Sequence, residues 1–493
     1  MTSLVLFLPM VAALAVLLLP AGTRFDRIGL GVAALQVLLV AGVWAAFEPG
    51  GGVQFQERAV WIPAIGVGYH VGLDGLSLPL VAMTAVLFLA CFAFDLGGPE
   101  TGRRYVALML FLETACIGVF VALDLILFFV FWDLSLVGMY FMIALWGHEG
   151  SRAAALKFFL YTFLGSLALL LGIIGLALHA EPRTFDMLAL AEQAPLAGEA
   201  RTGALVFLAL FLGFAIKTPV VPFHTWLPPA HVEAPAAGSA ILAGVMLKMG
   251  TYGFVRIAMG ILPDQWRSAA IAVIVLGVVS ALYGAVVALA QTSFKRLVAY
   301  TSINHMGYVM IGLGAAALAA GRRPDAAELA ASGAIAQMVA HGLVTGLLFL
   351  MTGVLYRRAG TYDFDRFGGL AAVTPRFAAV TALAAFASLG LPGLVQFIAE
   401  FQIFVGSFEA APLAVVLALL AVFVTAALMI WSLQRLFLGP VAPEWQGMPE
   451  LSRPEFAAGC ILGGLIVIFG VFPRPLLDVI EPAAQSLVAL LAP

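Results

Sequence analysis

The sequence predicts an all-α polytopic membrane protein with about 14 transmembrane helices, and its composition is the first reason. Of its 493 residues, 63% are hydrophobic and only 10% are charged, and the mean hydropathy is +1.08. A soluble domain carries about 25% charged residues, because it needs a polar surface that this chain lacks. The apolar runs are continuous rather than alternating, which excludes a β-barrel. The bilayer is therefore the solvent that fits this composition.

Fourteen apolar runs have the length expected of membrane spans, about 20 residues each. In chain order they are residues 3–22, 28–47, 75–95, 104–122, 124–146, 155–179, 203–223, 238–258, 269–290, 297–318, 332–355, 375–408, 412–437 and 455–473. The longest connections between them are 48–74, 180–202 and 438–454. No soluble domain is expected between the spans.

The basic residues predict the orientation of these spans. Fourteen of the 24 Lys and Arg residues lie in alternate connections on one side, beginning with the connection after the first span, and eight lie on the other side. Because cytoplasmic loops are enriched in Lys and Arg, we expect the first connection inside and both termini outside. No basic residue precedes the first apolar run, which favours a retained span over a cleaved signal peptide.

The chain lacks the sequence patterns of several functional classes. Cys91, Cys116 and Cys460 lie far apart with no CxxC motif, which argues against a disulfide framework, a zinc site or an iron–sulfur site. There is no nucleotide-binding fingerprint, and the net charge of −3 gives no basic face for nucleic acid. We therefore expect no metal and no cofactor in this chain.

Four ionisable residues lie within apolar spans: Asp133, Lys217, Lys248 and Glu400. Each such charge costs about 2.5–3.5 kcal/mol to insert into a membrane if it is left unpaired. Two interpretations follow, namely two structural ion pairs, or a series of titratable sites for proton or cation movement. The use of lysine favours movement, because a buried lysine releases its proton far more readily than an arginine.

Two of these residues lie beside expected helix breaks. Lys217 is followed by Pro219 and Pro222, and Glu400 follows Pro392 and Gly393. Proline removes a backbone donor, and a broken helix at membrane depth survives only where protein or water satisfies the freed groups. Paired interrupted spans are the sequence pattern of inverted-repeat transporters.

The breaks fall in spans seven and twelve, and their separation of five spans predicts two inverted five-helix repeats. Spans four to eight form the first antiporter-like repeat, residues 104–260, and spans nine to thirteen form the second, residues 261–438. Residues 1–103 then hold the first three helices, and residues 439–493 hold a C-terminal helix.

Further polar residues accompany the four charges. They are His224, His231 and Glu233 just past the first break, His305 and His341 in or near spans ten and eleven, and Glu113 in span four. A lone histidine in an apolar helix is often only a satisfied polar group, so each is a candidate supporting residue. Glu113 is a buried acid that could pair with a lysine of a neighbouring span.

Several long motifs resemble the antiporter-like membrane chains of respiratory complex I, and in particular the type called chain M, the counterpart of mitochondrial chain 4. The matching stretches run from about Gly72 to Gly439 and include VGLDGLSLPL, FAIKTPVVPFHTWLPPAHVEAP, VMLKMGTYGFVR, LVAYTSINHMGYVMIG, MVAHGLVTGLLFLMTGVLYRR and LGLPGLVQFIAEFQIF. Glu400 indicates chain M, since the other members of this wider family usually have lysine there.

The resemblance implies a role for each buried charge. Asp133 would pair with Lys217, the switching lysine of the first half-channel, Lys248 would be the central relay, and Glu400 would be the acid of the second half-channel. The family normally has glutamate where this chain has Asp133, so the shorter side chain is expected to weaken the pair or to require a bridging water.

The resemblance also implies a setting for the chain. It would be a proton-translocating subunit of NADH–quinone oxidoreductase, without a redox site of its own, in a bacterial inner membrane. NADH, FMN, iron–sulfur clusters and quinone would bind to partner chains. The partners would be the neighbouring antiporter-like chains, the peripheral redox arm and the lipid bilayer, with no nucleic acid.

Three alternatives remain open from the sequence. The chain could be a subunit of a Na⁺/H⁺ or K⁺/H⁺ antiporter, against which Glu400 argues. It could be the equivalent chain of a membrane-bound hydrogenase or ferredoxin-linked complex. It could also be a structural bundle whose buried charges only pair with one another.

Overall fold

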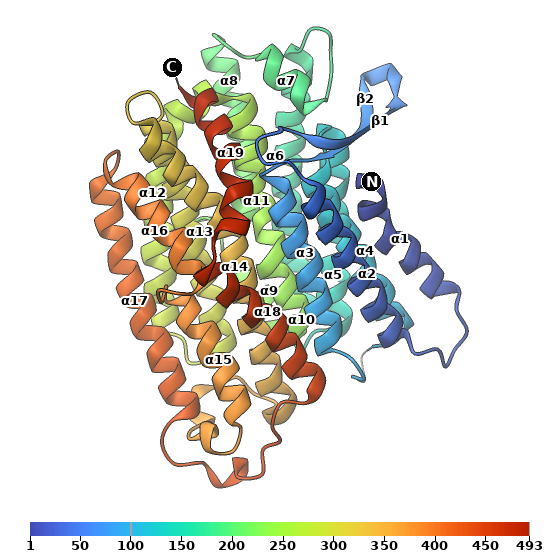
Figure 1. Ribbon diagram of the computed structural model, residues 1–493, viewed down its shortest axis with the longest axis vertical. Helices are drawn as coiled ribbons and strands as arrows, with labels where there is room; N and C mark the ends of the chain where they lie inside the picture. The colour runs from blue at the N-terminus through green and yellow to red at the C-terminus, as the bar shows by residue number, and fades with distance from the viewer. Residues whose placement is uncertain (99–100, 493) are drawn as a thin grey trace.

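The computed structural model describes residues 1–98 and 101–492 and is a bundle of helices packed side by side (Figure 1). The helices of the first half are α1 (Thr2–Leu18), α2 (Phe25–Ala46), α3 (Ser77–Phe94), α4 (Arg103–Val121), α5 (Leu125–Trp146), α6 (Ser151–His179), α7 (Met187–Gln193), α8 (Ala200–Lys217), α9 (Leu227–Glu233), α10 (Ala236–Ile241) and α11 (Leu247–Gly253). Those of the second half are α12 (Pro263–Leu289), α13 (Phe294–Ala319), α14 (Pro324–Ala359), α15 (Pro375–Ser388), α16 (Val395–Phe408), α17 (Pro412–Phe437), α18 (Arg453–Val471) and α19 (Arg474–Leu491).

Twelve helices among the described residues are long and apolar enough to cross a membrane, against the 14 spans predicted. The two missing from that count are present as shorter apolar helices. The first predicted span is α1, which is only 17 residues long. The predicted span 375–408 is divided into α15 and α16, each of 14 residues. The chain is therefore an integral membrane protein whose predicted spans each have a helical counterpart.

The connection 48–74 folds into a β-hairpin, which departs from the predicted all-α fold outside the spans. Strand β1 (Gln54–Ile62) pairs antiparallel with β2 (Val67–Leu73) through a short turn in which Gly66 has a φ of 76°. The run of Val, Trp, Ile and Tyr residues in these strands has high β propensity. Figure 1 shows the hairpin beside α7 at one end of the bundle.

A polar contact joins the hairpin to α7. His70 Nδ1 of β2 lies 2.6 Å from Asp186 Oδ2, while Asp186 Oδ1 caps α7 by accepting backbone hydrogen bonds from Leu188 and Ala189. Burial alone would raise the pKa of Asp186, but the contact with His70 and the hydrogen bond from Ala189 together hold it below its usual value. The hairpin and the end of the bundle are thus held together by a charged carboxylate.

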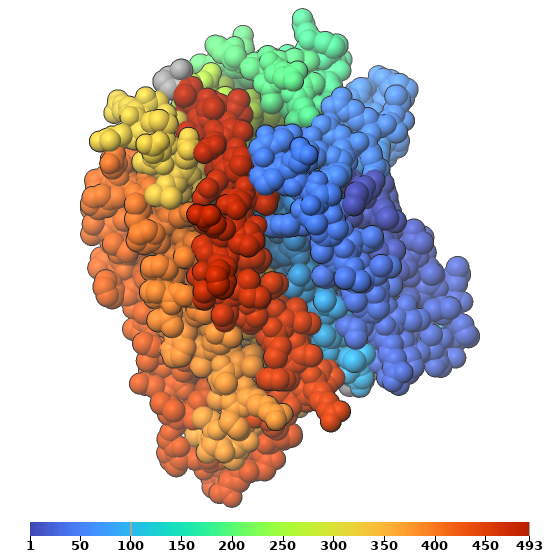
Figure 2. Space-filling view, viewed as in Figure 1, coloured from blue at the N-terminus to red at the C-terminus, as the bar shows by residue number. Residues whose placement is uncertain are grey.

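The C-terminal part holds two helices rather than the one predicted for residues 439–493. A capping box between Ser452 and Glu455 begins α18, and α19 follows after Pro473. Helix α19 is amphipathic, and its buried residues follow helical spacing: Leu476, Val479, Ile480, Ala484, Leu487, Val488 and Leu491. Figure 2 shows the C-terminal segment as a continuous band across one face of the bundle.

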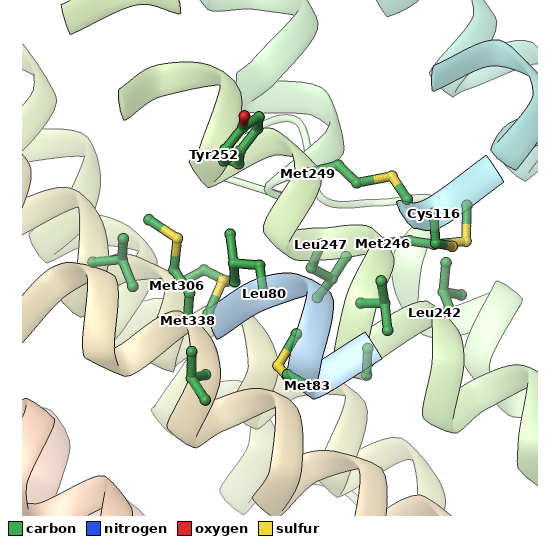
Figure 3. Close-up of a cluster of buried hydrophobic side chains, with 14 of the residues drawn as sticks. Leu80, Met83, Cys116, Leu242, Met246, Leu247, Met249, Tyr252, Met306 and Met338 are labelled. Atoms are coloured by element: carbon green, nitrogen blue, oxygen red, sulfur yellow. The ribbon is translucent and has the colours of Figure 1, made fainter. Parts of the chain in front are cut away.

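Helix α14 lies at the centre of the bundle, and every residue of its apolar window is buried. On one side it meets the segment that follows α10, in which two π-helical stretches, η2 (Leu242–Met246) and η3 (Phe254–Met259), flank α11. Figure 3 shows the methionine and leucine side chains of α3, η2, α11, α13 and α14 packed together here. Lys248 lies in this core, between Leu247 and Met249 of α11.

Candidate functional site

The first predicted break lies between α8 and α9. Helix α8 ends at Lys217, Pro219 has a φ of 28°, and α9 begins at Leu227, so the residues between them form turns. Trp226 Nε1 donates a hydrogen bond of 2.9 Å to the carbonyl of Ile216, which satisfies a group freed by the break. Pro222 lies in the same turn. The break leaves Lys217 at a helix end deep inside the protein.

Lys217 is 1% exposed, and its nearest partners come from α5. Its Nζ donates a hydrogen bond of 3.4 Å to Ser135 Oγ and lies 5.1 Å from the centre of the Trp132 ring. A lysine over an aromatic face gains about 0.5–2 kcal/mol, depending on desolvation. These contacts hold the ammonium group without neutralising its charge.

The contact between Lys217 and Asp133 expected from the resemblance is not direct in this structure. The ion pairs within 4.0 Å among the described residues do not include these two, although each charge acts on the other. Asp133 is half-buried, and its Oδ1 has no hydrogen-bond partner. Whether the shorter aspartate side chain is the cause stays a prediction, as does a bridging water between the two groups.

Lys248 has a direct and short contact with His341. Its Nζ lies 2.6 Å from His341 Nδ1 and donates a 2.5 Å hydrogen bond to the carbonyl of Ala243 in η2. Both side chains have no exposed surface. Lys248 thus lies between two π-helical stretches, which often mark functional positions in α-helices.

The second predicted break separates α15 from α16 and places Glu400 opposite His305. Gly390 and Gly393 in the break have φ values of 78° and 91°, which glycine adopts without strain, and Pro392 lies between them. Glu400 Oε1 accepts hydrogen bonds from Gln396 at 2.9 Å and Gln337 at 3.4 Å. It also lies 3.7 Å from His305 Nε2.

The two histidines connect these contacts. The ring centres of His305 and His341 are 5.3 Å apart, and His305 Nε2 lies 3.2 Å from the carbonyl of Ser388. Nδ1 of His305 and Nε2 of His341 have no hydrogen-bond partner. A buried series of groups therefore runs from Lys248 through His341 and His305 to Glu400.

Glu400 is also where this series reaches the outside of the bundle. It lines a groove of about 590 Å³ together with Gly390 and aromatic and aliphatic residues of α16 and α17. Phe401 and Phe408 in that groove are half exposed. Through this groove, Glu400 is the member of the series that lies next to the surface of the bundle.

The remaining candidate residues, two histidines and two glutamates, lie outside this series and differ in their contacts. The His231 ring stacks on Phe349 at 4.4 Å with both nitrogens unpartnered, and the His224 ring lies 4.8 Å from Tyr283. Glu233 Oε2 accepts a hydrogen bond from the Gly150 backbone. Glu113 is fully buried with neither oxygen partnered, so the lysine contact considered for it is absent here.

Sequence reasoning missed Lys295, which it placed in a connection. Lys295 is the second residue of α13 and has no exposed surface. The signal available in the sequence was the rarity of lysine, since the chain has only four. Among the described residues, no group of three or more His, Cys, Asp or Glu side chains could hold a metal ion.

With this geometry established, comparison with known proteins identifies the family. The family described as NADH:quinone oxidoreductase/Mrp antiporter, TM matches residues 122–426, which is more than half of the chain. The chain belongs to this family. Its matched region contains all four of the charges that the sequence placed at membrane depth: Asp133, Lys217, Lys248 and Glu400.

Members of the NADH:quinone oxidoreductase/Mrp antiporter family match the chain over nearly its whole length. F(420)H(2) dehydrogenase subunit M of Methanosarcina mazei is 39% identical over 448 residues, which cover 89% of this chain and 88% of that protein. NADH-quinone oxidoreductase subunit M of Rickettsia typhi is 36% identical over 502 residues, which cover 98% of each. The predicted resemblance to chain M is confirmed, and the chain is a subunit M-type member of the complex I class.

Solved structures of the family have the same fold. A chain of respiratory complex I from Thermus thermophilus with bound NADH superposes with a TM-score of 0.89 at 31% identity and covers 100% of both chains. A chain of the Mrp complex from Dietzia sp. DQ12-45-1b superposes with a TM-score of 0.84 at 21% identity, which is a likeness of fold alone.

Proposed function

We propose that this chain is the proton-translocating membrane subunit of a complex I-type NADH–quinone oxidoreductase in a bacterial inner membrane. The observation that supports this function most is the buried series Lys248, His341, His305 and Glu400. Four titratable groups at contact or near-contact distances are costly in a membrane interior unless they have a use.

The proton moves along this series in three transfers, from Lys248 to Glu400. Lys248 Nζ gives its proton to His341 Nδ1, and His341 passes one from Nε2 toward His305 Nδ1. Histidine suits this step because its two nitrogens accept on one side of the ring and donate on the other. His305 Nε2 then gives a proton to Glu400 Oε1, which releases it beside the groove. Each transfer breaks one bond to hydrogen and forms another, and each histidine ends in its other tautomer.

Lys217 and Asp133 form the other half of the proposed path. When Asp133 is near, its negative charge keeps the proton on Lys217. When the carboxylate moves away, the buried ammonium loses that stabilisation and gives the proton up toward Lys248. Moving one charge against 100 mV costs about 2.3 kcal/mol, which a change of a few ångströms in such a pair can supply.

The repeats assigned to residues 104–260 and 261–438 are part of this proposal. The breaks that end α8 and α15 support two halves of corresponding construction, each with a charge beside its break: Lys217 in the first and Glu400 in the second. Pro219, Pro222, Pro392 and Gly393 supply the irregular backbone that such sites need.

The redox cofactors NADH, FMN, iron–sulfur clusters and quinone belong, on this proposal, to partner chains. The neighbouring antiporter-like chains and the peripheral redox arm would complete the complex. A second candidate differs only in the electron donor, because F(420)H(2) dehydrogenase subunit M is 39% identical to this chain. Proton movement through this chain is common to both candidates.

Lys248→Met in the purified native complex, reconstituted in lipid vesicles, tests the function. We expect normal assembly with proton pumping and coupled quinone reduction lowered by about tenfold or more, the scale of a lost proton-transfer group. Lys157→Met is the matched control, because Lys157 is an exposed lysine of the same chain. An unchanged turnover with an unchanged number of protons per quinone in Lys248→Met would overturn the proposal.

A further inference from the structure

Lys295 is a third buried lysine, and its contacts are unusual for a cation. Its Nζ donates hydrogen bonds to the carbonyls of Ala234 at 2.6 Å and Val232 at 3.3 Å, and to Tyr362 Oη at 3.1 Å. The ion pairs within 4.0 Å among the described residues do not include it; Glu233 acts on it only from a distance. A buried cation without a carboxylate partner is costly, so a use for its charge or its proton is expected.

Hydrogen bonds connect Lys295 to the end of the bundle opposite the β-hairpin. Tyr362 Oη lies 2.9 Å from His148 Nε2, and His148 is half-buried in the connection between α5 and α6. Burial, and then the charge of Lys295, lowers the pKa of His148 to about 4. Burial also raises the pKa of Tyr362. At neutral pH, a neutral histidine thus faces a protonated phenol, which in turn faces the amino group of Lys295.

That end of the molecule is the one rich in arginine. The connections that meet at Lys295 are those between α5 and α6, between α12 and α13, and between α14 and α15, as shown by the hydrogen bonds from Phe294 to Tyr362 and from His148 to Glu233. All three belong to the set that carries 14 of the 24 basic residues. By the distribution of charge, this is the cytoplasmic side.

On the inner side of Lys295, His231 leads toward the centre of the protein. His231 is fully buried on α9, and both of its ring nitrogens lack a partner. The charges of Lys295 and Lys248 both act on His231, and His231 in turn acts on His341. His231 precedes Val232, whose carbonyl accepts a hydrogen bond from Lys295 Nζ, and an unpartnered imidazole at that position can accept a proton on one nitrogen and release one from the other.

We propose that His148, Tyr362 and Lys295 form the entrance by which protons from the arginine-rich side reach Lys248, with His231 as the intermediate acceptor. Lys295 Nζ gives a proton to His231 and is reprotonated through Tyr362 and His148 from water. His231 passes the proton to Lys248, so one proton moves inward and no bond other than those to hydrogen changes. This entrance rests on the proposed function and adds a second supply of protons to Lys248, beside the one from Lys217.

Lys295→Arg separates an entrance from a structural anchor. Arginine keeps the positive charge and donors for the carbonyls of Val232 and Ala234, but it does not release a proton near neutral pH. In the reconstituted complex, we expect normal assembly with proton pumping lowered by about tenfold. Lys157→Arg, at an exposed position, is the control. Full pumping by an assembled Lys295→Arg complex would show that Lys295 is only an anchor and would overturn the proposal.

Tyr362→Phe is a second test of the entrance, for use if the Lys295→Arg complex does not assemble. The variant removes one oxygen and keeps the ring, so we expect normal assembly and a turnover that falls more steeply than in the unaltered complex as the external pH rises, because proton uptake has become limiting. Tyr356→Phe is the matched control on a neighbouring tyrosine whose ring stacks on that of Tyr362. Identical pH profiles for the two variants would overturn the entrance.

The outcome for Lys248→Met distinguishes the two proposals. If Lys248→Met lowers pumping and Lys295→Arg does not, the relay stands and protons enter elsewhere. If Lys248→Met has no effect, the relay itself fails, whatever Lys295→Arg shows.

Discussion

Gly244 of η2 and Gly342 of α14 approach each other backbone to backbone. A methyl group on Gly244 would lie 3.2 Å from the carbonyl oxygen of Gly342, and one on Gly342 would lie 2.8 Å from the carbonyl oxygen of Gly244. This approach allows the neighbouring Lys248 and His341 to come within 2.6 Å. The two glycines thus allow the backbones to approach closely enough for Lys248 and His341 to make contact.

Gly342→Ala should therefore separate Lys248 from His341. The added methyl would overlap the sulfur of Met83 as well as the Gly244 carbonyl, and such overpacking costs about 1–3 kcal/mol. We expect a lower melting temperature of the purified complex and a loss of pumping. Gly464→Ala in α18 is the control, since nothing lies within 4 Å of its added methyl. Equal behaviour of the two variants would contradict this positioning role.

A glycine in the second break should control the carboxylate of Glu400. In Gly390→Ala, the new methyl lies 2.9 Å from Glu400 Oε2, and the positive φ adds about 1–2 kcal/mol of strain. We expect pumping to fall. Gly393→Ala is the matched control, because it has the same kind of backbone strain with open space around its methyl. If both variants lower pumping equally, strain rather than the carboxylate position is the cause.

The length of Asp133 should tune the first half of the path. Asp133→Glu extends the carboxylate by one methylene toward Lys217, so we expect pumping to be retained or to rise. Asp133→Asn removes the charge and should be as harmful as Lys217→Met. The measurement is the rate of proton uptake by vesicles that contain the complex. A fully active Asp133→Asn complex would show that the charge of Asp133 is not used.

The contact between His148 and Tyr362 should weaken in acid. The pKa of His148 is lowered from 6.5 to about 4 by burial and then by the charge of Lys295. An unfolded loop takes up the proton near pH 6.5 and the folded loop only near pH 4, so the stability is fully present above 6.5 and is lost as the pH falls toward 4. Two further residues face His148. The Tyr356 ring lies 4.0 Å from the His148 ring, and the backbone carbonyl of Glu233 accepts a hydrogen bond from the His148 backbone.

Hydrogen exchange of residues 147–150 and 360–363, corrected for the intrinsic effect of pH, measures this contact. Protection should decline between pH 6.5 and pH 4 in the unaltered complex. His148→Asn, which does not titrate, should show a flat profile across that window. A flat profile in the unaltered complex would contradict the prediction.

The spans were predictable from sequence because the bilayer demands long apolar runs, and each predicted run has a helical counterpart. Helix α19 was missed because its apolar residues are confined to one face, while Asp478 and Glu481 lower the mean hydropathy of the segment. The hairpin of β1 and β2 was missed because it lies outside the membrane, where hydropathy gives no signal.

The site was predictable as a set of residues but not as a set of contacts. Asp133, Lys217, Lys248 and Glu400 are conspicuous because a charge within an apolar run is rare. Whether two of them touch depends on packing between distant segments, so the sequence did not predict the contact of Lys248 with His341 or the lack of an ion pair between Lys217 and Asp133. Lys295 was missed because it lies at a span end, where a lysine is normally solvated. Here it contacts the carbonyls of Val232 and Ala234 and Tyr362 of a distant loop.

The complete burial of the apolar window of α14 has a consequence for the surroundings of the protein. No residue in the apolar window of this helix faces outward. Acyl chains and detergent tails therefore do not reach His341, and other helices separate the polar groups beside it from the lipid. Changes in bilayer thickness or lipid charge then act on the rim of the bundle. Glu400, which lines the groove beside α16, is the member of the series that the lipid environment can influence directly.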